Sequence, residues 1–228
     1  MTTTTLDALL ASSTWTRQLT DAQLDRVRFD MAVRPFAAGT TVCARATPSA
    51  HWLGVMDGML KLENITEAGK SSTFASVPAG AWFGEGAVLK GEPRPYEVVA
   101  LRDSAVAFLP RSSFMWLLED SHPFALWMVG HLNARLGHFV AMVQNQRLGD
   151  ITAQVAYGLA GLFHSDLYPS TERRITLSQE EIGRLCGLSR QVVNRTLQEL
   201  QERGALRLSY GSIEVTDLDV LKAIARGG

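Results

Sequence analysis

This sequence of 228 residues is poor in the features that define several other protein classes. It has only two cysteines, Cys43 and Cys186, far apart in the chain, so it predicts no disulfide framework and no iron–sulfur cluster with its usual four thiolates. No hydrophobic run approaches a membrane span, and the opening MTTTTLDALLASSTW lacks the positive charges of a secretory signal. We therefore expect a cytoplasmic protein with no membrane partner.

The motifs of common catalytic sites are missing too. The chain has no P-loop, no glycine fingerprint of dinucleotide-binding folds, no His-Glu-x-x-His and no Gly-x-Ser-x-Gly. The tripeptide Gly84-Glu85-Gly86 is too short for a phosphate-binding loop. We therefore expect neither an enzyme nor a metal site.

A basic excess is also absent, because the formal net charge is −1. Positive charge is concentrated locally instead, between residues 184 and 207, where only Glu199 and Glu202 oppose five arginines: Arg184, Arg190, Arg195, Arg203 and Arg207. Such a concentration can supply the phosphate contacts of a nucleic-acid-binding surface.

The segment from Ile175 to Val215 has the signals of a helix-turn-helix. Ser178 and Glu181 have the spacing of a capping box, which predicts the start of a first helix. Gly187 has the backbone freedom that a sharp turn between helices requires. Ser189 then predicts the cap of a second helix.

The second helix should bury one face and expose the other. Its buried face repeats at helical spacing as Val193, Leu197 and Leu200. Gly204 ends the helix, and apolar residues then alternate on both sides of Tyr210-Gly211, which is typical of a tight β-hairpin. The sequence therefore predicts a winged helix-turn-helix.

The exposed face of that second helix suits duplex DNA. Arginine reads guanine in the major groove, and asparagine or glutamine reads adenine. The candidate DNA-binding residues are Arg184, Ser189, Arg190, Gln191, Asn194 and Arg195. We expect the last four to contact base edges, and Ser189 and Arg184 to lie nearer phosphates. A helical hairpin without nucleic-acid affinity is the alternative.

The run IGRLCGLSRQVVNRTLQELQERGAL resembles the helix-turn-helix of the Crp/Fnr family of bacterial regulators. The resemblance covers nearly the full length and is strongest from Trp82 to Leu89 and from Leu132 onward. In that family a β-roll binds an effector, a long helix dimerises the protein and a winged helix binds a palindromic operator. The resemblance thus implies that the protein binds double-stranded DNA as a homodimer. It also implies RNA polymerase as a further partner and a small-molecule effector.

The predicted fold is α+β in three parts. Residues 1–122 have short alternating runs separated by glycines, which indicates a jelly-roll-like β-roll as effector or sensor domain, or a mere dimer scaffold. We expect helices around it at Leu6–Leu10, Asp21–Phe29 and Arg111–Glu119. Residues 123–149 form the dimerisation helix and hinge, and residues 150–228 the DNA-binding domain.

The dimerisation helix is expected from Pro123 to about Gln146. A wide stripe runs along it: Phe124, Trp127, Met128, His131, Leu132, Arg135, Leu136, Phe139, Met142 and Val143. At about 35 Å, such a face favours a parallel two-fold homodimer over packing on its own β-roll alone. Leu148-Gly149-Asp150 interrupts the helix, and Asp150 can cap the next one, Ile151–Phe163.

An effector pocket is implied by the resemblance alone. In the family's cyclic-nucleotide binders a Gly-Glu pair contacts the ribose, and an arginine followed by a hydroxyl residue holds the phosphate. Gly84, Glu85 and Arg94 match this pattern, but Pro95 replaces the hydroxyl residue and has no backbone N–H.

The implied adenine contacts also differ. Phe139 and Val140 stand where cyclic-AMP binders of the family carry hydroxyl residues, so polar recognition of the base is lost. The effector is therefore left unidentified, with cyclic AMP disfavoured. The pocket candidates are Gly84, Glu85, Arg94, Arg135 and Phe139.

Other interpretations stay open. His131 and His138 lie seven residues apart on one helix face, where an imidazole could ligate haem, although a lone helical histidine more often packs. Glu85 and Arg135 could form an ion pair that needs no ligand. The alternative function is a cyclic-nucleotide-binding regulator that acts through a protein partner, which would have no use for the polar face Ser189–Gln198.

Overall fold

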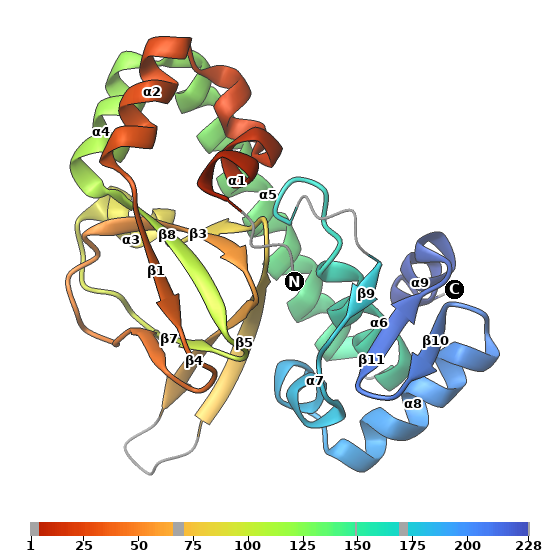
Figure 1. Ribbon diagram of the computed structural model, residues 1–228. Helices are drawn as coiled ribbons and strands as arrows, with labels where there is room; N and C mark the ends of the chain where they lie inside the picture. The colour runs from red at the N-terminus through yellow and green to blue at the C-terminus, as the bar shows by residue number, and fades with distance from the viewer. Residues whose placement is uncertain (1–4, 66–70, 149, 169–172, 228) are drawn as a thin grey trace. The chain divides into compact units, whose positions relative to one another are not determined.

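The computed structural model describes residues 5–65, 71–148, 150–168 and 173–227 (Figure 1). Gly149, part of the predicted hinge, lies outside them. The chain forms two compact units, of which the first comprises residues 1–71, 75–134 and 165–170 and the second comprises residues 72–74, 135–164 and 171–228. No helix among the described residues has the length and apolar character needed to span a bilayer.

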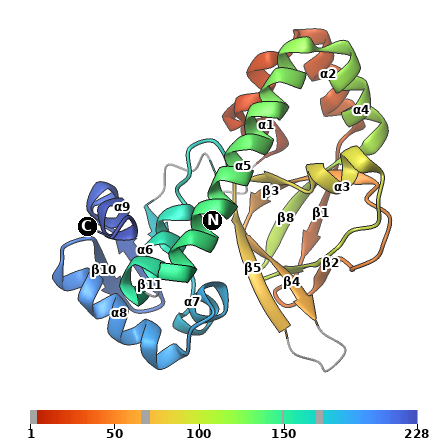
Figure 2. The ribbon, with the colours of Figure 1, turned by 180° about the vertical axis from the view of Figure 1, so that it is seen from behind.

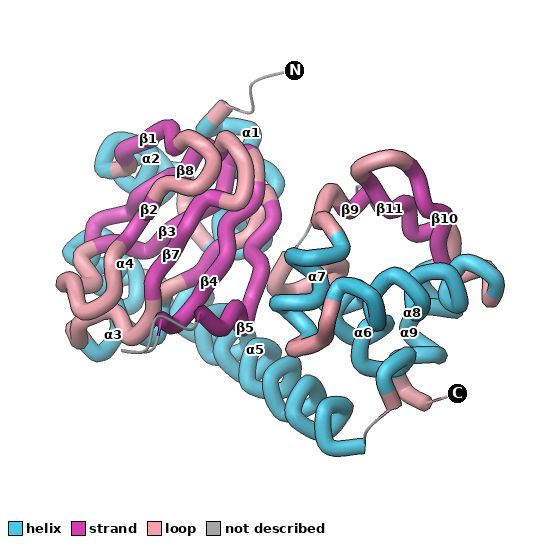
Figure 3. Tube along the Cα trace, turned by 90° about the horizontal axis from the view of Figure 1, so that it is seen from below, coloured by secondary structure: helices cyan, strands magenta, loops and turns pink. Residues whose placement is uncertain are grey.

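The first unit contains the predicted β-roll, built from two four-stranded sheets with the orders β1-β8-β3-β6 and β2-β7-β4-β5 (Figure 3). The first sheet contains β1 (Ala32–Phe36), β3 (His51–Asp57), β6 (Trp82–Phe83) and β8 (Ser104–Pro110). The second contains β2 (Thr41–Cys43), β4 (Met59–Ile65), β5 (Ser71–Pro78) and β7 (Glu97–Ala100). The predicted α+β class is confirmed.

The three helices predicted around the β-roll are present as α1 (Leu6–Ser12), α2 (Asp21–Asp30) and α4 (Arg111–Asp120). They gather at one end of the strands (Figures 1 and 2). A 3-10 helix η1 (Thr14–Gln18) and a short helix α3 (Glu85–Lys90) were not predicted. Helix α3 matters because it begins directly after Gly84, within the candidate effector pocket.

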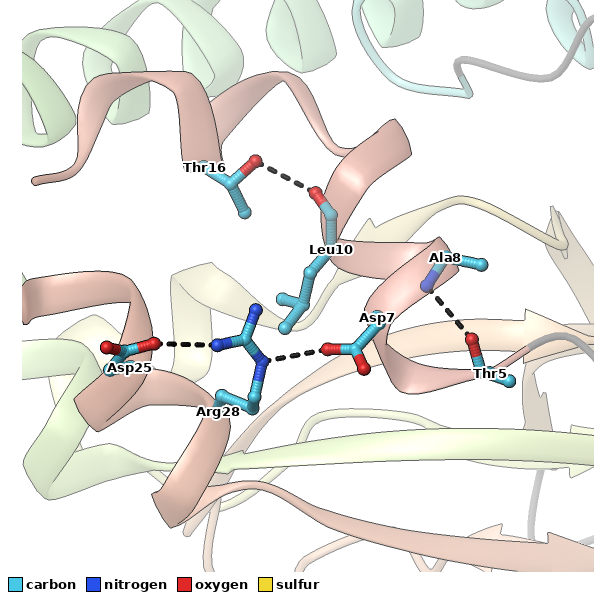
Figure 4. Close-up of polar contacts among 7 residues, drawn as sticks. All are labelled: Thr5, Asp7, Ala8, Leu10, Thr16, Asp25 and Arg28. Atoms are coloured by element: carbon cyan, nitrogen blue, oxygen red, sulfur yellow. Dashed lines mark hydrogen bonds and ion pairs between the residues drawn. The ribbon is translucent and has the colours of Figure 1, made fainter. Parts of the chain in front are cut away.

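Polar contacts occur within and between the N-terminal helices α1 and α2. The Thr5 side chain accepts a hydrogen bond of 3.2 Å from the Ala8 N–H and so caps α1 (Figure 4). Arg28 of α2 bridges Asp7 at 2.8 Å and Asp25 at 2.7 Å. All three bridging side chains are exposed, so we assign these ion pairs little stabilisation.

Tryptophans form the core between these helices and the sheet. The Trp15 ring centroid is 5.2 Å from that of Trp52 and 5.1 Å from that of Trp82. The Trp82 indole N–H donates to Ser13 Oγ at 2.7 Å. A Cβ on Gly54 would lie 2.9 Å from the Trp82 ring, so only glycine fits there. This packing fixes β6, the strand that leads into Gly84.

The long helix α5 runs from His122 to Leu148, slightly beyond its predicted bounds. The prediction that the apolar residues of α5 form one wide face for a partner is wrong. Phe124, Met128 and His131 are buried within the first unit, so they cannot contact a partner. A separate set of apolar side chains is exposed: Leu126, Val129, Leu136, Val140 and Val143. The helix thus has one face for its own core and another that is exposed.

The second unit has the predicted order of elements. Asp150 accepts from the Ala153 N–H at 3.0 Å and caps α6 (Ile151–Gly161), as predicted. The helices α7 (Gln179–Cys186) and α8 (Arg190–Glu202) follow, then the hairpin β10 (Leu206–Ser209) and β11 (Ser212–Val215). Two elements were not predicted: β9 (Arg174–Ile175), which pairs with β11, and the final helix α9 (Leu218–Ala225).

A histidine links the second half of α5 to α6 within this unit. The His138 ring stacks on Tyr157 at 5.4 Å, and the Tyr157 hydroxyl donates to the His138 carbonyl at 2.7 Å. Burial, the nearby His164 and Arg135 together lower the pKa of His138 to about 4. The neutral ring is therefore the form that this packing favours.

We expect a pH dependence from this site. Because folding lowers the pKa of His138 from its usual 6.5 to about 4, the unfolded chain binds the proton more readily between these values. The free energy of unfolding should fall as the pH drops below 6.5, by on the order of 1 kcal/mol by pH 5 after allowance for solvent screening. Urea unfolding measures this: His138→Phe should flatten the dependence, and the exposed His122→Gln should keep it. Equal slopes in both variants would contradict the assignment.

Candidate nucleic-acid interface and effector pocket

The turn of the helix-turn-helix is built as the caps predicted. The Ser178 N–H donates to Glu181 at 2.6 Å, the Glu181 N–H donates back to Ser178 Oγ at 3.2 Å, and Gly187 ends α7 with φ +69°. Sequence reasoning missed Gly183, where a Cβ would lie 2.6 Å from the Leu188 carbonyl oxygen. Any side chain there would push the turn at Leu188 away from α7, so glycine allows the turn to lie close against α7.

Helix α8 packs against the rest of its unit through one face. Ser189 caps it by accepting from the Val192 N–H at 3.4 Å, and its predicted apolar face is buried: Val193, Leu197 and Leu200. Gln201 of α8 accepts from the Leu208 N–H at 2.8 Å and so ties the helix to the hairpin. The opposite face of α8 is therefore presented by a fixed scaffold.

The predicted DNA-binding residues gather on that presented face and beside it. Arg184, Ser189, Arg190, Gln191 and Arg195 are exposed, and Asn194 is half-buried. Helix α8 carries the last four of the six in its first two turns, which makes them neighbours in space.

The local charge is smaller than the arginine count predicted. Glutamates pair with Arg184 (Glu180, 2.6 Å), Arg203 (Glu199, 4.0 Å) and Arg207 (Glu214, 3.4 Å). Among the described residues, no carboxylate lies within ion-pair distance of Arg190 or Arg195. Two arginines on α8 therefore carry the available positive charge.

Beside α8 lies a groove of about 640 Å³, bordered by the start of α7, Arg190 and the hairpin. The hairpin tip carries Tyr210, which is fully exposed. The sequence analysis predicted Tyr210 in the turn of the hairpin but did not predict a contact for its side chain. Its exposure makes it a further candidate for contact with a partner that covers α8.

In the first unit, the candidate effector residues Gly84 and Arg94 lie against each other. Gly84 has φ +89°, and a Cβ there would be 2.8 Å from Arg94 Nη1. Arg94 is only 2% exposed, and its Nη2 donates to the His51 carbonyl at 3.4 Å. Nη1 has no hydrogen-bond partner among the residues that the structure describes. A buried guanidinium with an unused donor is suited to an anion.

Two neighbouring groups respond to this arginine. Burial lowers the pKa of His51, and the positive charges of Arg34 and Arg94 lower it further. Burial raises the pKa of the Cys43 thiol, while the charges of Arg94 and then Arg34 oppose the rise. Burial is the larger cause in both cases, and the charges of Arg34 and Arg94 act on both groups.

Glu85 is buried beside the same loop. Its Oε1 lies 3.9 Å from Nε2 of His131 on α5, and the His131 ring stacks on Trp127 at 4.7 Å. His131 and His138 therefore both pack against aromatic rings of their own units, which favours packing roles over haem ligation. Among the described residues there is no group of three histidine, cysteine or acidic side chains suited to a metal ion.

The remaining pocket candidates, Arg135 and Phe139, belong to the second unit. Phe139 is half-buried, with its ring centroid 5.9 Å from that of His138. Their predicted part in the pocket, and the predicted ion pair between Glu85 and Arg135, stay predictions.

Comparison with known proteins identifies both parts of the chain. Residues 33–121 match the model of the cyclic nucleotide-binding domain, and residues 153–224 match that of the Crp-like helix-turn-helix domain. The chain belongs to the Crp/Fnr family of transcriptional regulators. The predicted resemblance is therefore confirmed.

Individual Crp/Fnr relatives agree over most of the length. The transcriptional regulator SdrP of Thermus thermophilus is 28% identical over 173 residues, which cover 75% of this chain and 82% of SdrP. The cyclic AMP receptor protein of the same bacterium is 29% identical, covering 76% of this chain and 78% of the receptor. FixK2 of Bradyrhizobium japonicum has the same fold, with a TM-score of 0.65, 20% identity, and coverage of 85% of this chain and 96% of FixK2.

The Crp/Fnr β-roll implies a cyclic nucleotide, and the residues present fit only part of one. The unused Arg94 donor beneath Gly84 fits the anionic group. Pro95 follows it with neither a hydroxyl nor an N–H, so the phosphate would lack donors at that position. The donors that Gly84 and Arg94 bring together therefore fit an anionic group better than a complete cyclic nucleotide.

Proposed function

We propose that this Crp/Fnr protein is a sequence-specific transcriptional regulator that binds a palindromic operator as a homodimer. The supporting observation is the face of α8, where Arg190, Gln191 and Arg195 are exposed and neither arginine has a described carboxylate partner. Arginine on a second helix of this kind reads guanine in the major groove. Base contacts then come from Arg190, Gln191, Asn194 and Arg195, and phosphate contacts from Ser189 and Arg184.

An exposed face suited to pairing of two copies supports the proposal that the operator is palindromic. The exposed apolar side chains of α5 lie on one face, with Leu136 at 62% and Val129 at 65% exposure. A two-fold axis beside this helix would present two copies of α8 to successive grooves, with half-sites about 10 bp apart. We expect the hairpin that carries the exposed Tyr210 to contact the flanking DNA backbone.

Gln191 sets the half-site sequence in this proposal. Family members often carry glutamate there, which only accepts hydrogen bonds and suits cytosine, whereas glutamine also donates. We expect Gln191→Glu to change the preferred base at one position of each half-site by about 1–3 kcal/mol. Selection from a randomised DNA pool measures the preference, with Gln198→Glu, farther along α8, as control. An unchanged preference in Gln191→Glu would remove this residue from the readout.

The effector is proposed to be an anion that contacts Arg94, and not cyclic AMP. Cyclic AMP at 1 mM, a roughly saturating level for a metabolite effector, is expected to leave the melting temperature and operator affinity unchanged. Thermal shift and DNA titration measure both. A saturable shift with cyclic AMP that is lost in Arg94→Met would overturn the proposal.

In this proposal, residues 1–122 sense the effector, residues 123–149 form the dimerisation helix and hinge, and residues 150–228 bind DNA. Regulation of this kind needs no catalytic step. We expect it to take place in the cytoplasm, where the chromosome lies, with RNA polymerase as a further partner. The alternative, action through a protein partner without DNA, is not favoured because residues 153–224 match the Crp-like helix-turn-helix domain.

A further inference from the structure

The exposed face of α5 has the spacing of a coiled-coil contact. Its residues follow one another at steps of three, four, three, four and three positions: Leu126, Val129, Asn133, Leu136, Val140 and Val143. All six are exposed. This is the alternation of a and d positions in a heptad, and we call these six residues the seam.

The seam suits a second copy of this same chain. None of its six residues is charged, and in a parallel symmetric pair each residue faces its own copy, where a charge would repel itself. Gly130 and Gly137 lie beside the seam, one heptad apart, and a Cβ on either would meet nothing within 4 Å. The chain's own packing thus does not require glycine there, whereas close approach of a second backbone would.

Asn133 is the polar exception on this apolar seam. An asparagine amide both donates and accepts, so two copies facing each other can bond. Shifting one helix by a heptad places Asn133 against Leu126 or Val140, and reversing it about the seam's centre places it against Leu136. Either change leaves the asparagine amide without a partner. A single asparagine at an a position is a known way to fix the alignment of paired helices.

We propose that Asn133 faces Asn133 of a second copy and fixes the pair as parallel and in register. This inference rests on the proposed homodimer and adds the residue that orients it. Parallel pairing is what delivers both copies of α8 to one side of the molecule, so Asn133 acts on operator binding without touching DNA.

Disulfide trapping in the full-length protein tests the orientation. In a Cys43→Ser background, the remaining Cys186 is buried and its pKa is raised to about 12, so it does not compete. Val143→Cys alone reports parallel pairs, since Val143 then faces itself. An equal mixture of Leu126→Cys and Val143→Cys proteins reports antiparallel pairs as a mixed disulfide. We expect the parallel product to exceed the mixed one at least about tenfold.

Asn133→Leu in the same background should tighten association about tenfold in sedimentation, yet reduce the parallel excess to less than about threefold or add higher oligomers. Gln144→Leu, just outside the seam, adds the same side chain and should keep the excess. Weaker association in Asn133→Leu, or an unchanged excess in a protein that forms no higher oligomers, would overturn the role of Asn133 while leaving the homodimer intact. A wild-type protein that stays monomeric when bound to its operator would instead overturn the homodimer, and this inference with it.

Discussion

Arg195→Ala is expected to weaken operator binding by roughly 30-fold to 10⁴-fold, because each copy loses a base contact of about 1–3 kcal/mol and a dimer has two copies. The side chain is exposed on α8, and no described carboxylate competes for it. Its loss should affect the specific site more than random DNA, because phosphate contacts elsewhere remain. Fluorescence anisotropy at one fixed salt concentration measures both affinities.

The matched control is Arg203→Ala, which removes an arginine at the end of the same helix. Arg203 lies 4.0 Å from Glu199, so its charge is already opposed. We expect less than about a threefold loss of operator affinity there. If Arg195→Ala and Arg203→Ala weakened binding equally, α8 would contribute general charge and not base recognition.

Leu136→Asp is expected to weaken dimerisation strongly, which is the second large effect. The side chain is 62% exposed on the seam, where two introduced carboxylates would face each other without a partner. A buried unpaired charge costs about 3–5 kcal/mol, which raises the dimer dissociation constant roughly 100-fold to 5,000-fold. Sedimentation should show monomers at micromolar concentration, and operator affinity should fall to that of a single half-site.

Phe29→Asp controls for a charge placed on an exposed apolar residue. Phe29 is 89% exposed at the end of α2, away from the seam in sequence and element. Its variant should dimerise and bind DNA as the wild type does. Dimers of normal strength in Leu136→Asp would place the pairing surface elsewhere.

Local signals made most of the second unit predictable. The capping box at Ser178, the cap at Ser189, the turn at Gly187 and the Tyr210-Gly211 hairpin are decided by residues within a few positions of one another, and each was confirmed. Two of the missed elements involve distant partners: β9 pairs with β11, and α3 follows Gly84, which lies against Arg94. Short elements of this kind leave little pattern in the sequence. Helix α9 was missed although Asp217 offers a local cap.

Tertiary packing also explains the two revised predictions. The apolar residues of α5 gave no sign of which would be covered by the chain's own core, so Phe124 and the exposed Leu126 were indistinguishable by type. Similarly, counting charges could not show that Glu214 on β11 faces Arg207 on β10. The fold decides which apolar and charged side chains remain available to partners.

A footprint of the wild-type protein on its selected operator tests the central claim most directly. We predict protection of guanines in two successive major grooves on one face of the duplex, centred about 10 bp apart, with both lost together in Leu136→Asp. Protection of a single half-site by a monomer, or equal protection of any sequence, would contradict the account.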